Sequence, residues 1–364
     1  MHAITGTAGA TRTPRRLLVV LITAVMAIGV TAAPLTSPAH AAETVDRGLF
    51  GSQDPTYDGV DRQATAILGL VAVNAKVPPL ASSWLLRQQC EDGSFSAYRA
   101  DPTRPCTGPD LVNYTGPNTN STALAAMALS ALATQNSRES RVARQAARKA
   151  VAWLVAQQQA DGGWEWLAGL GSDSTSTAMA LTAIAKPKST SHRRGWAFLG
   201  TNMQAGMDCG VTFTADSPII DPLSTSWTFL ASQGSPPYSR YRGPRELTPC
   251  SPTQTNVRAS GSWLASELTK GAGQIPSAFE PGQTDWNSTA LATLGMTQRD
   301  GSTREMRLGL AALKANVSAY VEVDGVDRAT PLGTLLVIAH ASGADPEDFG
   351  GINLSERLLA TLQK

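Results

Sequence analysis

The chain has 364 residues, of which 42% are hydrophobic and 16% are charged, and its formal net charge is +1. This near balance of charge argues against a nucleic-acid partner, because such partners select a basic surface. The length exceeds that of a typical single domain, yet closed helical toroids reach this size as one unit, so we expect one closed architecture.

The first 41 residues have the pattern of a secretory signal peptide. Arg12, Arg15 and Arg16 precede an apolar stretch over residues 17–30 that is too short to span a bilayer, and Ala39-His40-Ala41 supplies small residues for cleavage. Removing these three arginines, and no acidic residue, lowers the formal charge from +1 to −2. We therefore expect residues 42–364 to be a secreted protein without a transmembrane anchor. The general export route and the twin-arginine route both stay open.

Six times along the chain, a polar residue is followed four positions later by a threonine within an Ala- and Leu-rich run. The intervals between these pairs are typical of an array of helical hairpins. Asp, Asn or Thr in the first position suits a helix N-cap, because its side chain accepts a hydrogen bond from a backbone N–H of the first turn. The pairs are Asp61 and Thr65, Asn118 and Thr122, Asp173 and Thr177, Asp221 and Thr225, Asp285 and Thr289, and Thr330 and Thr334.

Each of these Ala-rich segments is followed by a more amphipathic segment, and four of the latter carry a tryptophan near their end. We predict an all-α fold, a single six-hairpin (α/α)6 toroid with buried inner helices and half-exposed outer helices. The first and last repeats share Asp-Gly-Val-Asp-Arg, at 58–62 and 324–328. A ring that joins these repeats leaves no exposed apolar end. The hairpins are expected over residues 57–89, 118–159, 173–204, 221–270, 285–320 and 330–363.

The four cysteines predict two disulfides, because an even number in an exported protein indicates pairing. Cys90 and Cys106 share one loop rich in Pro and Gly, which leaves Cys209 to pair with Cys250. The second pair would join opposite ends of the ring, so the loop over 234–249 would have to fold back. Zinc ligation is the alternative, but the cysteines lack paired short spacings, so we expect neither a metal nor another cofactor.

Two turns carry a family resemblance. Residues 89–95 and 158–164 match position for position, each with Gln at the start and Asp-Gly shortly before an aromatic residue. They resemble the Gln/Trp repeats of the terpenoid cyclase and protein prenyltransferase superfamily, including the squalene-hopene cyclases. The segment over 173–181 is also similar to inner helices of the cobalamin-carrier toroids. The resemblance implies a toroid that holds a bulky, partly apolar small molecule, corrinoid-like or isoprenoid-like.

The same resemblance does not imply a known activity. The sequence lacks the acidic Asp-x-Asp-Asp cluster of the class II cyclases, and it lacks an Asp-x-Cys pattern with a histidine that would bind the zinc of the prenyltransferases. Whether the protein is an enzyme stays open at this point.

Inner helices of a toroid run parallel, so their N-terminal ends gather at one rim. We expect ligand contacts there from polar and aromatic residues, although capping and wall packing would explain the same residue types. Ring closure would also place Asp58 and Asp61 beside Asp324 and Asp327, where like charges would share a proton or a calcium ion. The candidate binding residues are Asp58, Asp61, Asn118, Asp173, Asp221, Asp285, Asp327, Trp166, Trp227 and Trp286.

We expect a monomeric, secreted protein that binds a small molecule at its central cavity. The first alternative is an enzyme, cyclase-like or carbohydrate-active, in which two rim carboxylates act as acid and base. The second is a cell-surface module that binds another protein. A cavity of at least a few hundred Å³ favours the ligand, whereas rim carboxylates about 5–10 Å apart favour glycoside chemistry.

Overall fold

The computed structural model describes residues 46–135, 138–185, 189–203, 209–234, 246–251, 256–278, 280–297 and 304–364. The expected signal peptide, together with most of the loop expected between Cys209 and Cys250, lies outside these residues. Residues 40–364 form one compact unit. In the described part of the chain, no helix combines the length and hydropathy that a bilayer crossing requires.

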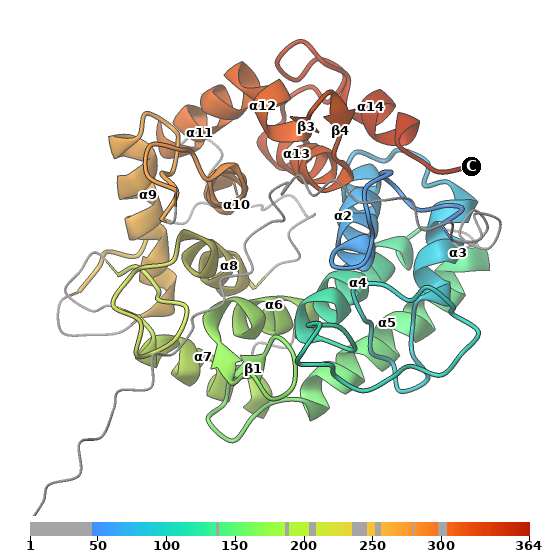
Figure 1. The fold of residues 1–364 in the computed structure, drawn as a ribbon. Coiled ribbons are helices and arrows are strands. Elements are labelled where there is room, and N and C mark those ends of the chain that lie inside the picture. The colour runs from blue at the N-terminus through green and yellow to red at the C-terminus, as the bar shows by residue number, and fades with distance from the viewer. Residues whose placement is uncertain are drawn as a thin grey trace, which may run out of the picture. The chain divides into compact units, whose positions relative to one another are not determined.

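Thirteen α-helices are found in the described residues, and six of them form an inner set (Figure 1). Each inner helix contacts the next one along the chain, and the last contacts the first, so their contacts form a closed cycle. This cycle is consistent with the toroid that the sequence predicts. The inner helices are α2 (Gly59–Ala72), α4 (Thr119–Leu132), α6 (Ser174–Ile184), α8 (Pro222–Ser232), α10 (Trp286–Thr297) and α13 (Ala329–Ser342).

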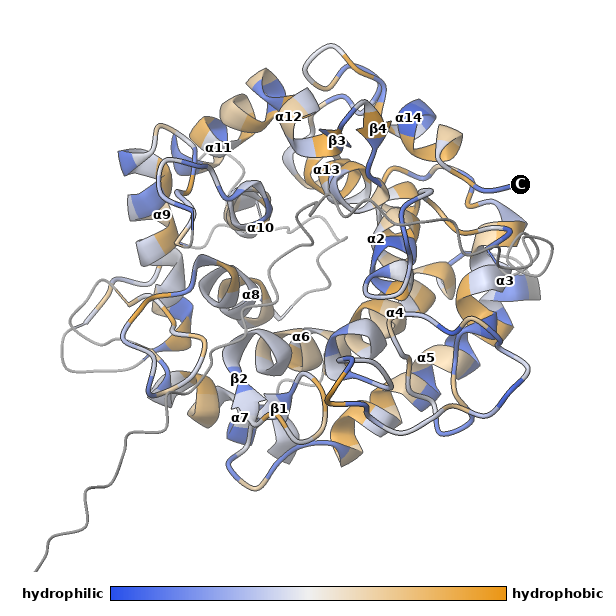
Figure 2. Ribbon diagram, in the orientation of Figure 1, coloured by the Kyte–Doolittle hydropathy of each residue, from blue (hydrophilic) through white to orange (hydrophobic). Residues whose placement is uncertain are grey.

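The remaining helices lie around this inner set (Figure 1). They present buried apolar residues inward and polar residues outward, as Figure 2 shows for α5, whose Ala146, Ala150 and Leu154 are buried. The outer elements are α3 (Pro79–Arg87), α5 (Arg138–Ala156), α7 (Thr190–Thr201), the 3₁₀ turn η1 (Val257–Ala259), α9 (Ser260–Lys270), α11 (Arg304–Ala315), α12 (Val317–Val321) and α14 (Leu354–Ala360).

Two short antiparallel hairpins lead into inner helices. Strand β1 (Trp164–Glu165) pairs with β2 (Ser172–Asp173), so that Trp164 lies opposite Asp173, just before α6. Strand β3 (Glu322–Val323) pairs with β4 (Val326–Asp327) just before α13. Both hairpins therefore place the residues that precede an inner helix.

The turns that resemble Gln/Trp repeats join each outer helix to the next. Gln158 Nε2 donates to the carbonyl oxygen of Gly162 at 2.8 Å, and to that of Ser191 in α7 at 2.9 Å. Gly162 has φ +95°, and a Cβ there would lie 2.6 Å from the carbonyl oxygen of Arg194, also in α7. Only glycine combines this conformation with so close an approach. The turn thus binds the neighbouring outer helix through main-chain contact.

The first and last helices of the inner set approach each other through glycines. A Cβ at Gly69 of α2 would lie 2.6 Å from the carbonyl oxygen of Gly333, and one at Gly333 of α13 would lie 2.5 Å from that of Thr65. The absence of side chains at both positions brings the two backbones together. This contact joins repeat six to repeat one.

The two ends of the described chain complete one further turn between them. Phe50 forms an antiparallel bridge with Leu362, as Gln89 does with Phe95 inside the first full turn. The backbone N–H of Gln363 donates to Leu49 at 2.9 Å, and that of Gly48 donates to Gln363 at 2.8 Å. One turn of the series is therefore built from both ends of the chain.

Both expected disulfides are present. Cys90 pairs with Cys106, and Cys209 pairs with Cys250. The expectation that the second pair would lie at opposite ends of the ring was wrong. Cys209 occupies a left-handed turn position, with φ +63°, and packs beside Cys250 and Ala259 at the start of the next outer element. The turn after α7 brings it there, as the other turns bring their glycines to the next outer helix.

Candidate ligand-binding site

Four inner helices begin with a polar cap, as the sequence predicts. The oxygen of each cap accepts the backbone N–H three residues on, at distances of 2.7–3.0 Å. Such a cap contributes about 1 kcal/mol to the stability of the fold. The side chains are therefore committed to their own helices, at least in part. The caps and their donors are Asn118 with Ser121, Asp173 with Ser176, Asp221 with Ser224, and Asp285 with Ser288.

The cap assignments for the first and last repeats were wrong. The N-cap of α2 is Asp58 and not Asp61, and neither N-cap side chain, in α2 or in α13, makes a capping hydrogen bond. In α2 the N–H groups of Gly59 and Val60 already donate to backbone carbonyls, at 2.8 and 2.7 Å. A side-chain cap has little left to satisfy there.

In α13 the N-cap is Arg328, so Thr330 lies within the first turn. Pro331 occupies the third helical position and has no N–H to donate to a cap. The expected cap thus lies three residues inside the helix in the first repeat and two residues inside it in the last.

Because Asp61 does not cap α2, its carboxyl group is left in the wall of a small hollow. The hollow also contacts Asn118, Ser121, Tyr114 and Trp166, and its volume of about 20 Å³ suits a single water molecule. Asp61 Oδ1 is buried and has no hydrogen-bond partner. The pKa of Asp61 is raised to about 7. Burial is the main cause, a hydrogen bond with Ser121 opposes the shift, and the charge of Asp58 adds to it.

Two further buried polar atoms lack a partner in the first turns of the next inner helices. They are Oδ1 of Asn120 in α4 and Oγ of Ser176 in α6. Helices α2, α4 and α6 are consecutive neighbours. Among the described residues, the only other atoms of this kind are Nε of Arg62 and Oγ1 of Thr228. A buried polar group without a partner is costly, so these three atoms are candidates for pairing with water or with a bound molecule.

The next part of the rim satisfies its own polar groups. Thr175 Oγ1 in α6 lies 2.8 Å from Ser224 Oγ in α8. Ser226 Oγ donates to the carbonyl oxygen of Ser288 in α10 at 3.4 Å. The unpaired atoms at the helix starts therefore lie in the first turns of α2, α4 and α6, and not evenly around the six helices.

Aromatic residues border the same place. Trp166 and Tyr114 stack with ring centroids 6.3 Å apart and an interplanar angle of 15°. The carbonyl oxygen of Trp166 accepts the backbone N–H of Thr119 at 2.9 Å, which fixes it to the start of α4. Of the three tryptophans expected at the rim, the structure places Trp166 beside Asp61. Trp227 is buried in the core, and Trp286 packs against the core at the start of α10.

The capping carboxylates act on one another electrostatically. Burial raises the pKa of Asp173 to about 7; the hydrogen bond from the backbone N–H of Ser176 opposes the shift, and the charge of Asp221 adds to it. Burial also raises the pKa of Asp221, and the charge of Asp285 adds to that shift. These three caps therefore lie near enough to influence one another along α6, α8 and α10.

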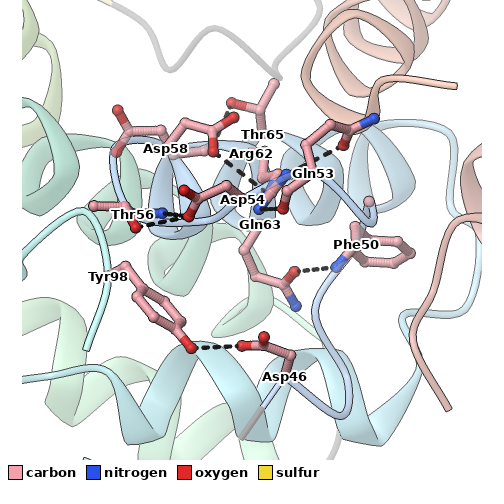
Figure 3. Close-up of polar contacts among 12 residues, drawn as sticks. Asp46, Phe50, Gln53, Asp54, Thr56, Asp58, Arg62, Gln63, Thr65 and Tyr98 are labelled. Atoms are coloured by element: carbon pink, nitrogen blue, oxygen red, sulfur yellow. Dashed lines mark hydrogen bonds and ion pairs between the residues drawn. The ribbon is translucent and has the colours of Figure 1, made fainter. Parts of the chain in front are cut away.

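At the ring closure, two of the four expected acidic residues, Asp58 and Asp327, pair with arginines. Asp58 pairs with Arg62 at 3.6 Å, and Arg62 donates to the carbonyl oxygen of Gln53 at 2.7 Å (Figure 3). Asp327 accepts from Arg357 Nε at 2.9 Å. Burial raises the pKa of Asp58, while the charges of Arg62 and Arg328 oppose the shift. No group of three or more metal-ligating side chains occurs in the described residues.

Asn120, Ser121 and Ser176 were not predicted as site residues. The sequence does carry a pattern that includes them. Asn118 and Asp173 are each followed by polar residues two and three positions later. These positions lie at the start of an inner helix, but the residue types are those of ordinary first-turn residues. Only the structure distinguishes a paired hydroxyl from an unpaired one.

Comparison with known proteins gives a fold likeness at low similarity. No protein-family model matches the chain, and no curated protein matches it. The ligand-free type II terpene cyclase MstE from Scytonema is 13% identical, with a TM-score of 0.45, covering 78% of this chain and 88% of that chain. A variant of MstE in complex with geranylgeranyl dihydroxybenzoate is 14% identical, with a TM-score of 0.35, covering 79% and 98%.

A protein from Actinoplanes is 14% identical to this chain, with a TM-score of 0.33, covering 78% of this chain and 99% of that chain. Similarities of this size assign no family, substrate or activity.

Proposed function

We propose that this protein is a six-hairpin α/α toroid that binds a bulky, partly apolar small molecule over its rim, with only the polar end of the ligand reaching the first turns of α2, α4 and α6. The observation that carries the proposal is the set of three unpaired, buried polar atoms, Asp61 Oδ1, Asn120 Oδ1 and Ser176 Oγ. A ligand that pairs with them would remove the cost of leaving them buried.

The chemistry of these atoms limits the ligand. Asn120 Oδ1 accepts only, and Asp61 Oδ1 accepts when ionised, whereas the hydroxyl of Ser176 both donates and accepts. The polar end of the ligand should therefore carry hydroxyl or amide N–H donors. The neighbouring rings of Tyr114 and Trp166 suit an apolar or planar part of it. Corrinoids with amide groups and isoprenoid alcohols, the classes that the sequence resemblance implies, both satisfy these requirements.

The test combines ligand recovery with two variants. Native mass spectrometry of the protein purified from its culture medium should reveal a retained molecule. Thermal shifts with cyanocobalamin and with geranylgeraniol then test the two classes. Ser176→Ala and Asn120→Ala should weaken ligand binding while leaving the free protein as stable as before, or more so, because they remove unpaired polar atoms.

Ser224→Ala is the matched control. The Ser224 hydroxyl is hydrogen-bonded to Thr175 and Asp221. Its loss should therefore lower the melting temperature of the free protein without changing ligand affinity. No retained molecule, with no thermal shift by either probe, would contradict the proposal.

A second function, acid catalysis by Asp61, is supported by one observation. A buried carboxyl group with a pKa of about 7 is in part protonated at neutral pH and lies beside aromatic rings. It would act as a proton donor to an unsaturated ligand. Incubation with geranylgeraniol, followed by mass spectrometry of the products, tests this. Isomerised product that disappears in Asp61→Asn supports catalysis, and unchanged geranylgeraniol contradicts it.

We also propose that residues 1–41 are removed on export and that the protein acts outside the cell as a monomer. The two disulfides support an oxidising location. N-terminal sequencing of protein from the medium should begin near residue 42, and light scattering should give the monomer mass. A start at Met1, or protein retained inside the cell, would contradict the export proposal.

A further inference from the structure

A second, larger cavity lies beside the hollow at Asp61, on the far side of Trp166. Its volume is about 790 Å³, within the range of about 300–1,000 Å³ that small-molecule sites occupy. It is enclosed by the turn after α3, the loop over 102–109, the end of α5 and the residues of β1. Trp166 borders both spaces, and Trp153 of α5 lines this cavity as well.

The charged side chains that line the cavity are largely committed to the protein itself. Arg99 donates to the carbonyl oxygens of Gln89 and Pro102, each at 3.0 Å. Glu165 accepts the backbone N–H groups of Gly169 and Gly171, each at 2.9 Å. These hydrogen bonds fix the positions of both side chains in the wall. The charged residues of the lining carry both signs, so neither sign dominates the cavity; they are Arg99, Arg104, Glu91, Asp92 and Glu165.

The groups that remain available are two indole rings and an amide. Trp153 and Trp166 are both only partly buried. Within the described residues, neither indole N–H has a hydrogen-bond partner, and neither does the side-chain amide of Gln157, one helical turn after Trp153. Since Tyr114 stacks on one face of Trp166, the ring is held rigidly beside the cavity. Flat indole faces with neutral donors and acceptors beside them suit a ligand of polyhydroxylated rings.

The wall opposite α5 is fixed covalently. Cys90 and Cys106 both line the cavity, and their disulfide closes the loop that carries Pro102 and Pro105. Asp101 further braces this loop by accepting the N–H of Thr103 at 3.0 Å. The cavity is thus formed without a ligand, which lowers the entropic cost of binding.

We propose that this cavity is a saccharide-binding site, in which sugar rings stack on Trp153 and Trp166 and their hydroxyls pair with the indole N–H groups and Gln157. The site is separate from the one proposed for the apolar ligand, although Trp166 borders both. A chain of sugar rings fits the volume better than a single ring, because the two indoles come from different elements.

Isothermal titration with cellohexaose, xylohexaose, maltohexaose and chitohexaose tests the proposal. At least one should bind to the wild-type protein. Trp153→Ala and Trp166→Ala should each weaken that binding by at least about tenfold, which corresponds to the loss of one stacking contact. Trp196→Ala is the matched control, because this tryptophan is also partly buried on an outer helix, α7, but does not line the cavity.

Ser176→Ala should bind the same saccharide with unchanged affinity, which separates this site from the proposed apolar-ligand site. Circular dichroism of each variant establishes that it is folded. The proposal is overturned if none of the four saccharides binds, or if binding survives in the folded Trp153→Ala, Trp166→Ala double variant. It is also overturned if a proline-rich peptide binds to these tryptophans and the saccharides do not.

Discussion

The hydroxyl oxygen of Thr177 accepts the backbone N–H of Trp164 at 2.9 Å, and this bond joins an inner helix to the turn before it. The equivalent bond recurs at the same distance in three other repeats, from Phe95 to Thr122, from Val211 to Thr225 and from Ile275 to Thr289. The threonine that recurs in the sequence therefore fixes each turn onto its helix. This explains why it is retained where the surrounding residues vary.

Thr177→Val should lower the free energy of unfolding by about 1–3 kcal/mol, because it leaves the buried N–H of Trp164 without an acceptor. Thr182→Val is the control in the same helix, since the Thr182 hydroxyl donates only to Ala178 within α6. That change leaves no N–H unpaired and should cost clearly less. Urea denaturation measures both, and equal effects would contradict this role of Thr177.

Gly162→Ala should destabilise the fold by about 2 kcal/mol or more, because the new Cβ would collide with the carbonyl oxygen of Arg194 in addition to the cost of its positive φ. Gly171→Ala measures the cost of the positive φ alone, without a collision. Gly171 has φ +86°, but nothing lies within 4 Å of the position that a Cβ would take there. The melting temperature of Gly162→Ala should therefore be well below that of Gly171→Ala. The reverse order would refute the contact between the turn and α7.

Asp61 should make the protein less stable as the pH rises from about 4 to 7. Its pKa is raised from the ordinary value of 3.8 to about 7, so the folded state holds a proton in this range that the unfolded state has lost. The contribution of protonated Asp61 to the unfolding free energy is fully present below about pH 4, and it is lost as the pH rises through about 7. Asp61→Asn should reduce the slope of the unfolding free energy against pH over this interval, while the contribution of Asp173, whose pKa is also raised to about 7, remains.

Asp216→Asn, at an exposed loop position, controls for the loss of one carboxyl group. It should leave the slope of stability against pH as it is in the wild-type protein. Identical slopes for Asp61→Asn and the wild-type protein would show that Asp61 is not buried as described.

The two disulfides should differ in their contribution to stability. Cys209 and Cys250 are separated by 41 positions and Cys90 and Cys106 by 16, so the first closes the longer loop. Replacing both members by alanine should cost about 4 kcal/mol for the long loop and about 3 kcal/mol for the short one. Denaturation of the two double variants in guanidinium chloride gives the order, and a larger loss for the shorter loop would contradict it.

The sequence predicts the helical class and four of the six caps because these depend on local chemistry. A carboxylate or amide directly before an Ala-rich helix is placed to accept a backbone N–H of the first turn. The four residues that cap as expected are Asn118, Asp173, Asp221 and Asp285. Asp61 was assigned wrongly because the N–H groups at the start of α2 find backbone acceptors from other segments. Such tertiary contacts leave no local pattern.

The cavity under the loop over 102–109 could not be predicted for a similar reason. In the sequence, Trp153 lies near the end of an amphipathic outer helix, where packing in the wall is sufficient to explain it. Its second role depends on a loop that begins about 50 positions earlier and on Trp166 from the following turn. A binding surface assembled from three separate segments has no motif of its own.

The turn shared by the two ends of the described chain has a consequence for how the molecule comes apart. In a linear helical array, the end repeats have a neighbour on one side only and fray independently. Here Gly48 and Leu49 hold Gln363 through their main chains. Fraying at either end opens the same joint, so a protease that trims one end also loosens the other. The first and last described repeats therefore protect each other, and neither is a free end.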